Sequence, residues 1–348
     1  VANNLKINNS SITISPESIG DKFKDCIYHC EQPIYRTAPV PLYLLSELVQ
    51  KNDFKVVLTG EGADEVAFGY NIFKETLIRS KLINSNNQEK WLNEIDNLYP
   101  YLKQYSKRYK ALMKEFYLKS LDNPNSPLFS HQIRISNKNL LLKFLKPENL
   151  ETLSEFNLEN QIEENLPKNF ETFSPLQRTQ TIEMQTLLSG YLLSSQGDRM
   201  SMAHSIEGRY PFLDHNVIEL LAAMPDHIKL NGLNEKYVLK ESFKTNLPES
   251  IVNRHKQPYR APEAISLLTK DIKQQYLNKE VIDSQNFFEW RLVEKLISKI
   301  ESIGINSSFN ENFALVNIIS TTIFLDYFSS SFGINQTQIH NNIKETQL

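Results

Sequence analysis

The stretch KVVLTGEGADEVAFGY, residues 55–70, decides the predicted fold. Residues 55–60 have the apolar run of a buried strand and end at a glycine. Gly60 and Gly62 then bracket a single glutamate, and the acidic pair Asp64–Glu65 follows at once. Glycine permits a sharp backbone turn and the close approach of a ligand. The pattern therefore predicts a strand whose carboxyl end carries a tight, acidic turn.

The residues before this strand predict an α/β fold with a parallel sheet. Residues 41–50, PLYLLSELVQ, have helical apolar spacing and lead into the strand, as a helix does in a parallel α/β sheet. Upstream, residues 10–14, SSITI, suggest a short strand. Ser15 followed by Pro16 is typical of a helix start. The sheet is thus expected at the N-terminal end of the chain.

The rest of the chain is expected to be mostly helical, since no convincing strand appears after the acidic turn. We predict four parts: residues 1–71 as the α/β part, 72–175 as a helical insertion, 176–334 as a helical remainder and 335–348 as a polar tail. Individual helices are predicted at 176–195, 214–223, 236–245, 289–302 and 309–330.

Composition and charge exclude several classes of protein. The 348 residues carry a net charge of −3 at pH 7, which gives no basis for a nucleic-acid-binding surface. The most apolar stretch, residues 313–328, is shorter than the ~20 residues of a membrane span, so we predict a buried helix and no membrane insertion. Cys26 and Cys30 are expected to be reduced thiols on one helix face rather than zinc ligands, which suits a cytoplasmic protein.

The acidic turn is a candidate nucleotide site. Ligands of open α/β sheets bind beyond the carboxyl ends of the strands, where backbone N–H groups and a helix N-terminus favour phosphate. Carboxylates would repel phosphate unless a hard cation lies between them or one carboxylate acts as a base. Asp64 is therefore a candidate magnesium ligand and Glu61 a candidate proton acceptor. The alternative is a structural turn in which Asp64 and Glu65 cap a helix.

Three further clusters lie downstream. Residues 193–214 mix charged with apolar residues, which suggests a partly buried ionic network or a functional site; the charged members are Asp198, Arg199, Glu207, Arg209 and Asp214. Lys236 opens a predicted amphipathic helix. The side chains expected to be buried by that helix are Tyr237, Leu239 and Phe243. The helix dipole disfavours a lysine at a helix start, which indicates a role for Lys236 other than capping. Residues 254–262, RHKQPYRAP, form a basic loop.

In their order along the chain, TGEGADE, DRMSMAHSIEGRYPFLDH, EKYVLKE and RHKQPYRAP resemble the motifs of the asparagine synthase family. The resemblance covers about residues 20–265 and is closest to the glutamine-dependent, asparagine-synthetase-like enzymes. It implies an adenine-nucleotide alpha-hydrolase-like fold, with residues 1–71 forming part of the nucleotide-binding core. It also implies that ATP and magnesium convert a substrate carboxylate to an acyl-adenylate with release of pyrophosphate. Ammonia, made from glutamine by a separate N-terminal domain, then gives the amide and AMP.

The resemblance implies a role for each residue of the glycine turn. Thr59 and Gly60 match the nucleotide-contacting dipeptide before the catalytic glutamate, and Gly62 completes the turn that admits the nucleotide. Glu61 matches that glutamate, which supports adenylation and can take the proton of the attacking ammonia. The chemistry is consistent, because neutral ammonia becomes positive as it attacks and a nearby carboxylate can accept its proton.

Roles also follow for charged residues of this motif and of the others, and Glu65 is assigned to support of the turn. Asp64 matches the aspartate that binds magnesium together with the pyrophosphate, and Lys236 matches the lysine that stabilises charge on the phosphate and carbonyl oxygens. Asp198 and Arg199 fall in the stretch that lines the nucleotide site. A fixed cation beside an oxygen that gains charge typically lowers a barrier by about 3 kcal/mol.

One motif of the family has no match. A serine-glycine-glycine-x-aspartate-serine loop wraps the pyrophosphate in the family, but none of the ten glycines here sit as a pair. In the family that loop lies upstream of where this sequence begins. We therefore expect the C-terminal piece of a longer enzyme, without the N-terminal glutaminase domain and the first strands of its sheet. This piece alone is expected neither to bind ATP tightly nor to turn over.

Three functions stay open at this point. The first is asparagine synthetase activity on L-aspartate. The second is amide formation on another carboxylate by a biosynthetic-cluster amidotransferase, a β-lactam synthetase or a lasso-peptide cyclase; β-lactam synthetases typically carry tyrosine where this chain has Glu61, which favours an external ammonia nucleophile. The third is a non-catalytic scaffold. Because family members are often dimers, a homodimer is also an expectation.

Overall fold

The computed structural model describes residues 1–100, 107–136, 138–154, 156–257 and 263–331. Within these ranges the chain is mostly helical and has one two-stranded parallel sheet. The predicted polar tail at 335–348 lies outside the described residues. None of the described helices is long and apolar enough to cross a membrane.

Among the helices before the long central helix, α2 (Pro16–Cys30) and α3 (Pro39–Lys51) form as predicted. The set is α1 (Ala2–Leu5), α2, α3, α4 (Ala63–Val66), α5 (Asn71–Asn84), α6 (Gln88–Glu94), α7 (Lys107–Lys119), α8 (Gln132–Ile135), α9 (Lys138–Leu142), α10 (Pro147–Ser154) and α11 (Leu158–Glu164). The set from the central helix onward is α12 (Pro175–Glu183), the π-helix η4 (Met184–Asp198), α13 (Arg199–Met202), α14 (His215–Ala223), α15 (Asp226–Lys229), α16 (Tyr237–Phe243), α17 (Glu249–Val252), α18 (Lys270–Gln275), α19 (Lys279–Gln285), α20 (Trp290–Ile303) and α21 (Phe309–Ser331).

The sheet consists of β1 (Val56–Leu58) and β2 (Glu207–Arg209), which pair in parallel with Val56 opposite Glu207 and Leu58 opposite Arg209. The parallel pairing confirms the predicted sheet type. The prediction that this strand is buried was wrong, because Leu58 is 73% and Val56 37% exposed. The apolar run is typical of a strand covered on both faces, whereas the two strands described here leave β1 open to solvent.

The strand predicted at residues 10–14 is absent; these residues belong to no helix or strand. Branched side chains such as Ile12 favour extended backbone, but a strand also needs a neighbour that supplies its hydrogen bonds. The helix start just after it is confirmed, since the Ser15 Oγ accepts a hydrogen bond of 3.2 Å from the Ser18 N–H and Pro16 is the first helical residue.

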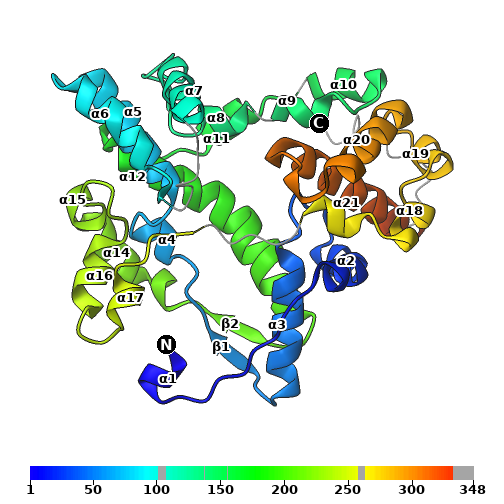
Figure 1. The fold of residues 1–348 in the computed structure, drawn as a ribbon, viewed down its shortest axis with the longest axis horizontal. Helices are drawn as coiled ribbons and strands as arrows, with labels where there is room; N and C mark the ends of the chain where they lie inside the picture. Colours follow the sequence, from blue (N-terminus) through cyan, green and yellow to red (C-terminus); the bar gives the residue numbers. More distant parts are fainter. Residues whose placement is uncertain (101–106, 137, 155, 258–262, 332–348) are drawn as a thin grey trace.

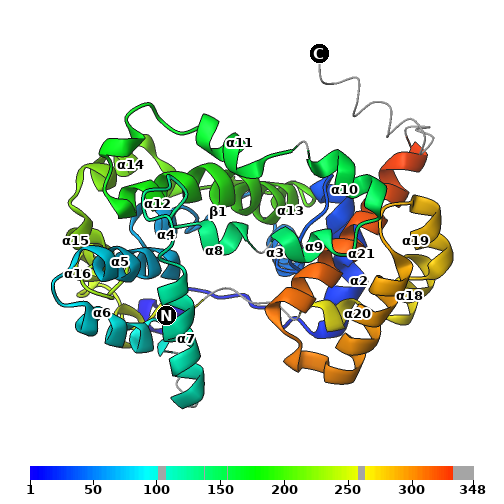
Figure 2. The ribbon, with the colours of Figure 1, turned by 90° about the horizontal axis from the view of Figure 1, so that it is seen from above.

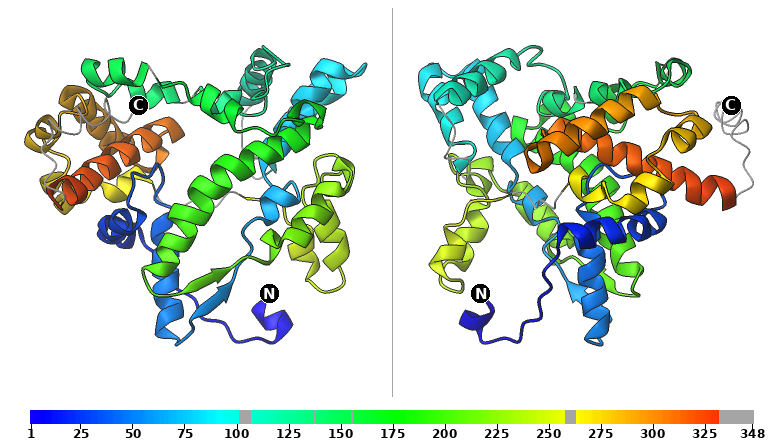
Figure 3. Two further views of the ribbon diagram at one scale, coloured as in Figure 1. Left: turned by 180° about the vertical axis from the view of Figure 1, so that it is seen from behind. Right: turned by 45° about the vertical axis from the view of Figure 1, so that its right-hand side comes forward.

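A long continuous helix made of α12, η4 and α13 runs through the middle of the molecule. It begins with a capping box in which Ser174 and Gln177 exchange side-chain-to-backbone hydrogen bonds. This confirms the long helix predicted at 176–195, which continues to Met202. Figure 3 shows it as the green diagonal between two groups of helices. One group contains α5, α6 and α14 to α17, and the other contains α2 and α18 to α21 (Figures 1 and 2).

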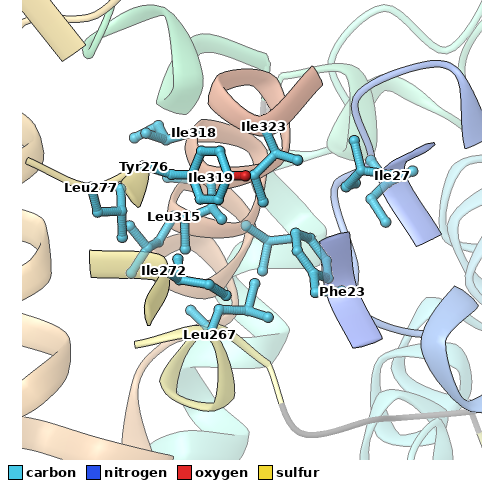
Figure 4. Packing of buried hydrophobic residues seen from close by; sticks show 14 of the residues in the cluster. Phe23, Ile27, Leu267, Ile272, Tyr276, Leu277, Leu315, Ile318, Ile319 and Ile323 are labelled. Atoms are coloured by element: carbon cyan, nitrogen blue, oxygen red, sulfur yellow. The ribbon is translucent and has the colours of Figure 1, made fainter. Parts of the chain in front are cut away.

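The largest hydrophobic core joins the N-terminal helix α2 to the C-terminal helices (Figure 4). Phe23 and Ile27 of α2 pack in one buried cluster with Leu315, Ile319 and other residues of α21. The apolar stretch at 313–328 is therefore a core helix, as predicted, and Cys26 and Cys30 are free thiols buried in the same cluster. The burial predicted for α16 also fails, because Tyr237 and Leu239 are only partly buried and Phe243 is 49% exposed.

Candidate active site

The glycine turn at residues 60–62 joins the carboxyl end of β1 to the short helix α4. Gly62 has a φ of 88°, which side-chain-bearing residues rarely adopt, and a Cβ atom there would lie 2.2 Å from Leu213 Cδ2. Gly60 is different, since a Cβ atom would meet nothing within 4 Å. The fold therefore demands glycine at position 62, whereas it leaves open space over Gly60. The preceding Thr59 extends the sheet pairing, because its N–H donates 3.0 Å to the Arg209 carbonyl.

The turn places Asp64 between two lysines from distant parts of the chain. Its Oδ1 lies 2.9 Å from Lys236 Nζ, and its Oδ2 lies 2.8 Å from Lys256 Nζ. All three side chains are largely but not fully buried. One carboxylate thus holds two ammonium groups next to the end of β1, and the cluster carries a net positive charge.

Backbone strain supports this arrangement. Lys236 precedes α16 in a left-handed conformation with a φ of 52°, which typically costs about 1–3 kcal/mol in a residue with a side chain. Gly69 lies on the other side, where a Cβ atom would be 2.0 Å from Asp64 Oδ1 and 2.4 Å from Lys236 Cε. The ion pair therefore requires glycine at position 69.

A second ion pair, between Lys74 and Glu235, is more deeply buried than the ion pairs of Asp64. Glu235 is buried, with Oε2 2.6 Å from Lys74 Nζ, and its Oε1 accepts the Lys256 backbone N–H at 2.6 Å. Burial acts to raise the pKa of Glu235, but the hydrogen bonds and the charge of Lys74 outweigh it, so the pKa lies below its usual value. Glu235 therefore fixes the backbone at both Lys236 and Lys256.

Glu61 lies near a second group, formed by Tyr210 and Asp198. The Tyr210 hydroxyl donates a hydrogen bond to Asp198 Oδ1. Burial, together with the charges of Asp198 and Glu61, raises the pKa of Tyr210. A Cβ atom at position 208 would lie 2.6 Å from the Tyr210 hydroxyl, so Gly208 makes room for this ring. Glu61 and Asp198 thus both lie near enough to Tyr210 for their charges to act on its hydroxyl.

The Arg199 side chain forms its ion pair away from Glu61 and Asp64, with Glu31. Its Nη1 lies 2.6 Å from Glu31 Oε2, next to the C-terminal end of α2.

The prediction of a partly buried ionic network at 193–214 was wrong. Arg209 pairs with Glu207 at the surface, and Asp214 caps α14 through the Asn216 N–H. Arg209, Glu207 and Asp214 thus find their partners within two residues along the chain, at the surface, and they form no network buried among the apolar residues of this stretch.

Glu65 is buried beneath the turn. Burial raises its pKa to about 7, helped by the charges of Asp64 and Glu183 and opposed by hydrogen bonds from its own backbone and from Tyr70. The Gln180 side chain, on α12, donates 3.0 Å to the Glu65 carbonyl and thereby ties the turn to the central helix. These contacts agree with the predicted supporting role.

With this geometry known, comparison with known proteins identifies the family. The model of the asparagine synthase family matches residues 1–324. The chain belongs to the asparagine synthase family. Membership implies the adenine-nucleotide alpha-hydrolase fold, of which the described residues contain a small parallel sheet and a large helical part.

Relatives within the asparagine synthase family carry two kinds of name. The chain is 26% identical to amidase chyE of Penicillium rubens over 87% of its length and 47% of the relative's. It is 28% identical to asparagine synthetase [glutamine-hydrolyzing] 1 of Bacillus subtilis, over 74% of its length and 38% of the relative's. It is 22% identical to amidase chry2 of Gibberella zeae, over 93% of its length and 49% of the relative's. The chain thus spans about half or less of these curated relatives.

The magnesium implied by the family can be tested against the residues present. Magnesium is usually held by one or two carboxylates together with waters and substrate phosphates, rather than by a cage of protein ligands. The described residues contain no group of three or more His, Cys, Asp or Glu that could hold a metal. Asp64 offers one largely buried carboxylate beside two lysines suited to phosphate. These residues fit a magnesium ion that is shared with a polyphosphate.

Sequence reasoning missed several residues that the structure brings to this asparagine-synthase-type site. Lys256 lies in the basic loop RHKQPYRAP, which was noted without a role for any residue; positions 258–262 of that loop lie outside the described residues. Tyr210 lies in the predicted motif but gave no signal beyond its place there. Gly69 could have been noticed as the third glycine within ten residues.

A pocket of about 660 Å³ is lined in part by Lys74, the lysine that pairs with the buried Glu235. Its other walls include Trp91, Tyr99 and His255. Neither Glu61 nor Asp64 lines it. Residues of the predicted 72–175 region, together with residues 231–234 and His255, therefore line a cavity that does not include the cluster around Asp64.

Proposed function

We propose that this protein is an ATP-dependent ligase that activates a carboxylate as an acyl-adenylate and converts it to an amide with ammonia. The observation that carries the proposal is the Asp64 carboxylate held between Lys236 and Lys256 at the carboxyl end of β1. Parallel α/β sheets bind their ligands at this end. The open space over Gly60 gives a nucleotide room to approach the backbone.

In the first step, Lys236 and Lys256 bind the phosphate oxygens and neutralise the charge that moves onto pyrophosphate as it leaves. Asp64 would hold magnesium, which supplies further neutralisation of the phosphates when bound. For that, at least one lysine turns from Asp64 toward the substrate, because both carboxylate oxygens are paired in the structure. Asp64 thus keeps the two cations in place until the polyphosphate arrives.

In the second step, Glu61 accepts the proton of the attacking ammonia. AMP then leaves as the amide forms, so one C–N bond replaces one C–O bond. Tyr210, hydrogen-bonded to Asp198, lies near enough to Glu61 to be affected by its charge, which keeps this side of the site polar. Thr59 and Gly60 contact the nucleotide in this scheme, with Gly62 shaping the turn, and Arg199 remains a prediction without a contact to this group.

The acceptor carboxylate distinguishes two versions of this function. L-aspartate, with ammonia from glutamine, is the first candidate, and a relative named asparagine synthetase supports it. A different carboxylate is the second candidate. It is supported by the two amidases, whose similarity extends over 87% and 93% of this chain against 74% for that synthetase.

The test uses residues 1–348 together with whatever its gene encodes on either side. AMP release is measured with ATP, magnesium and glutamine, with and without L-aspartate. Aspartate-dependent AMP and equimolar asparagine support the first candidate. AMP that forms only when another carboxylic acid is supplied supports the second. No AMP with any carboxylate contradicts the ligase and leaves a non-catalytic scaffold.

A matched pair of variants assigns the base. Glu61→Gln should lower amide formation by about 10²- to 10⁴-fold. Glu241→Gln, at an exposed ion pair with Lys244 on α16, should leave the rate unchanged. Equal rates in both variants would remove Glu61 from the mechanism.

A further inference from the structure

Lys229, the last residue of α15, is a fully buried lysine whose Nζ has no hydrogen-bond partner among the described residues. Burial lowers its pKa to about 8, opposed by the charge of Asp226. Asp226 itself accepts a hydrogen bond of 2.6 Å from Ser174 Oγ at the start of α12. An ammonium group without a hydrogen-bonded partner in the interior is costly, which calls for a physical reason for its presence.

The partner of this ammonium is an aromatic ring. Lys229 Nζ lies 4.1 Å from the centre of the Phe68 ring, within the range of a cation–π interaction. The Phe68 ring is also stacked on Phe73, with ring centres 4.6 Å apart. Phe68 is fully buried and belongs to the small cluster that joins α5 to α12.

Phe68 connects this cluster to the catalytic turn. Its backbone is in the left-handed region, with a φ of 56°, which is strained for a bulky residue. The next residue is Gly69, whose N–H donates 2.7 Å to the Asp64 carbonyl and whose missing Cβ leaves room for Asp64 and Lys236. If the Phe68 ring moved, the backbone at Gly69 would relax toward the ion pair.

We propose that Lys229 is a positioning residue: by holding the face of the Phe68 ring, it keeps the strained Phe68–Gly69 backbone in the conformation that sets Asp64 between Lys236 and Lys256. It touches neither substrate nor the reacting atoms. Its effect on catalysis rests on the function proposed above, while its effect on the turn does not.

This role predicts that removing the charge of Lys229 loosens the turn locally without lowering the overall stability of the protein. Methionine has nearly the length of lysine without the charge, so Lys229→Met removes the cost of burying an ammonium and keeps the apolar packing. The melting temperature of Lys229→Met should therefore equal or exceed that of the wild type. The turn, by contrast, loses the contact that holds the Phe68 ring.

The experiment compares Lys229→Met with Lys244→Met, an exposed lysine that pairs with Glu241 on the adjacent α16. Thermal unfolding, amide hydrogen exchange of residues 64–70 and the kinetics of AMP formation are measured on each. We expect Lys229→Met to keep its melting temperature, to exchange the Gly69 amide several-fold faster and to lose about 10- to 100-fold in kcat/KM for ATP. Lys244→Met should match the wild type in all three.

Two results would overturn the proposal. A lower melting temperature with uniformly faster exchange would make Lys229 an ordinary core residue, and unchanged exchange at 64–70 would separate it from the turn. The variant Phe68→Leu gives an independent check, since Lys229→Met should add no further change in exchange when the ring is already absent. If the wild-type protein forms no AMP, the ligase function fails, and the exchange data still decide the role of Lys229.

Discussion

Asp64 Oδ2 and Lys256 Nζ lie 2.8 Å apart, although 192 residues separate them in the chain. The contact brings the basic loop after α17 against the turn after β1. The Lys256 ammonium also lies 5.2 Å from the centre of the Tyr70 ring, so a carboxylate and an aromatic face both hold it. Lys256 is therefore placed before any ligand binds.

Lys256→Met should weaken ATP use without unfolding the protein. In the proposed function the substitution removes one of two cations that bind the phosphates, so we expect kcat/KM for ATP to fall by about 10²-fold, in line with the loss of one preorganised electrostatic contact. Steady-state AMP formation measures it. Lys273→Met is the control, because Lys273 pairs with Glu301 at the surface. Equal activity of the two variants would show that Lys256 has no part in phosphate binding.

Gly60→Ala and Gly62→Ala should separate two uses of glycine in one turn. At position 62 a methyl group would meet Leu213 at 2.2 Å in a left-handed backbone, so stability should fall by at least about 2 kcal/mol. At position 60 the methyl group meets nothing within 4 Å. Gly60→Ala should unfold like the wild type yet bind ATP more weakly. Denaturant unfolding and ATP titration measure both, and unimpaired ATP binding by Gly60→Ala would mean that the nucleotide does not approach there.

Glu65→Gln should change the pH dependence of stability. The folded-state pKa of about 7 lies above the ordinary value of 4.5, so between these values the folded state binds more protons than the unfolded state. Stability of the wild type therefore falls as pH rises through this window. The variant should match the wild type near pH 4.5 and exceed it by roughly 2–3 kcal/mol above pH 7. Thermal unfolding from pH 4.5 to 8 tests this, with the exposed Glu241→Gln as control. A constant difference across the range would contradict it.

Ile319→Ala tests the core that joins the two ends of the described chain. Ile319 is fully buried between α2 and the C-terminal helices. Its truncation should cost about 2–5 kcal/mol through lost burial and the cavity left behind. Ile305→Ala, at a residue that is 88% exposed, should stay within about 0.5 kcal/mol of the wild type. A small cost at Ile319 would mean that the α2–α21 packing contributes little to folding.

Local sequence signals predicted the helices well. Ser15 with Pro16, the periodic residues of α3 and the apolar stretch of α21 each contain their information within one or a few turns, and all three elements form as expected. The strand β2 was missed, because Glu207, Gly208 and Arg209 have none of the branched or aromatic residues that favour strands. That strand exists because the backbone of β1 supplies its hydrogen bonds.

The sequence by itself determined the chemistry that this protein has available: the glycine turn after a strand, the carboxylates Glu61 and Asp64 beside it and the lysine Lys236 at a helix start. It did so because residue types and short spacings are local properties of the chain. The tertiary structure alone decided which charges meet. It directed Arg199 to Glu31 and Lys256 to Asp64, since pairs so far apart in the chain come together only when the helices pack and fix their backbones. It also turned Tyr210 toward Asp198, a contact between near neighbours in the chain that residue types alone do not specify.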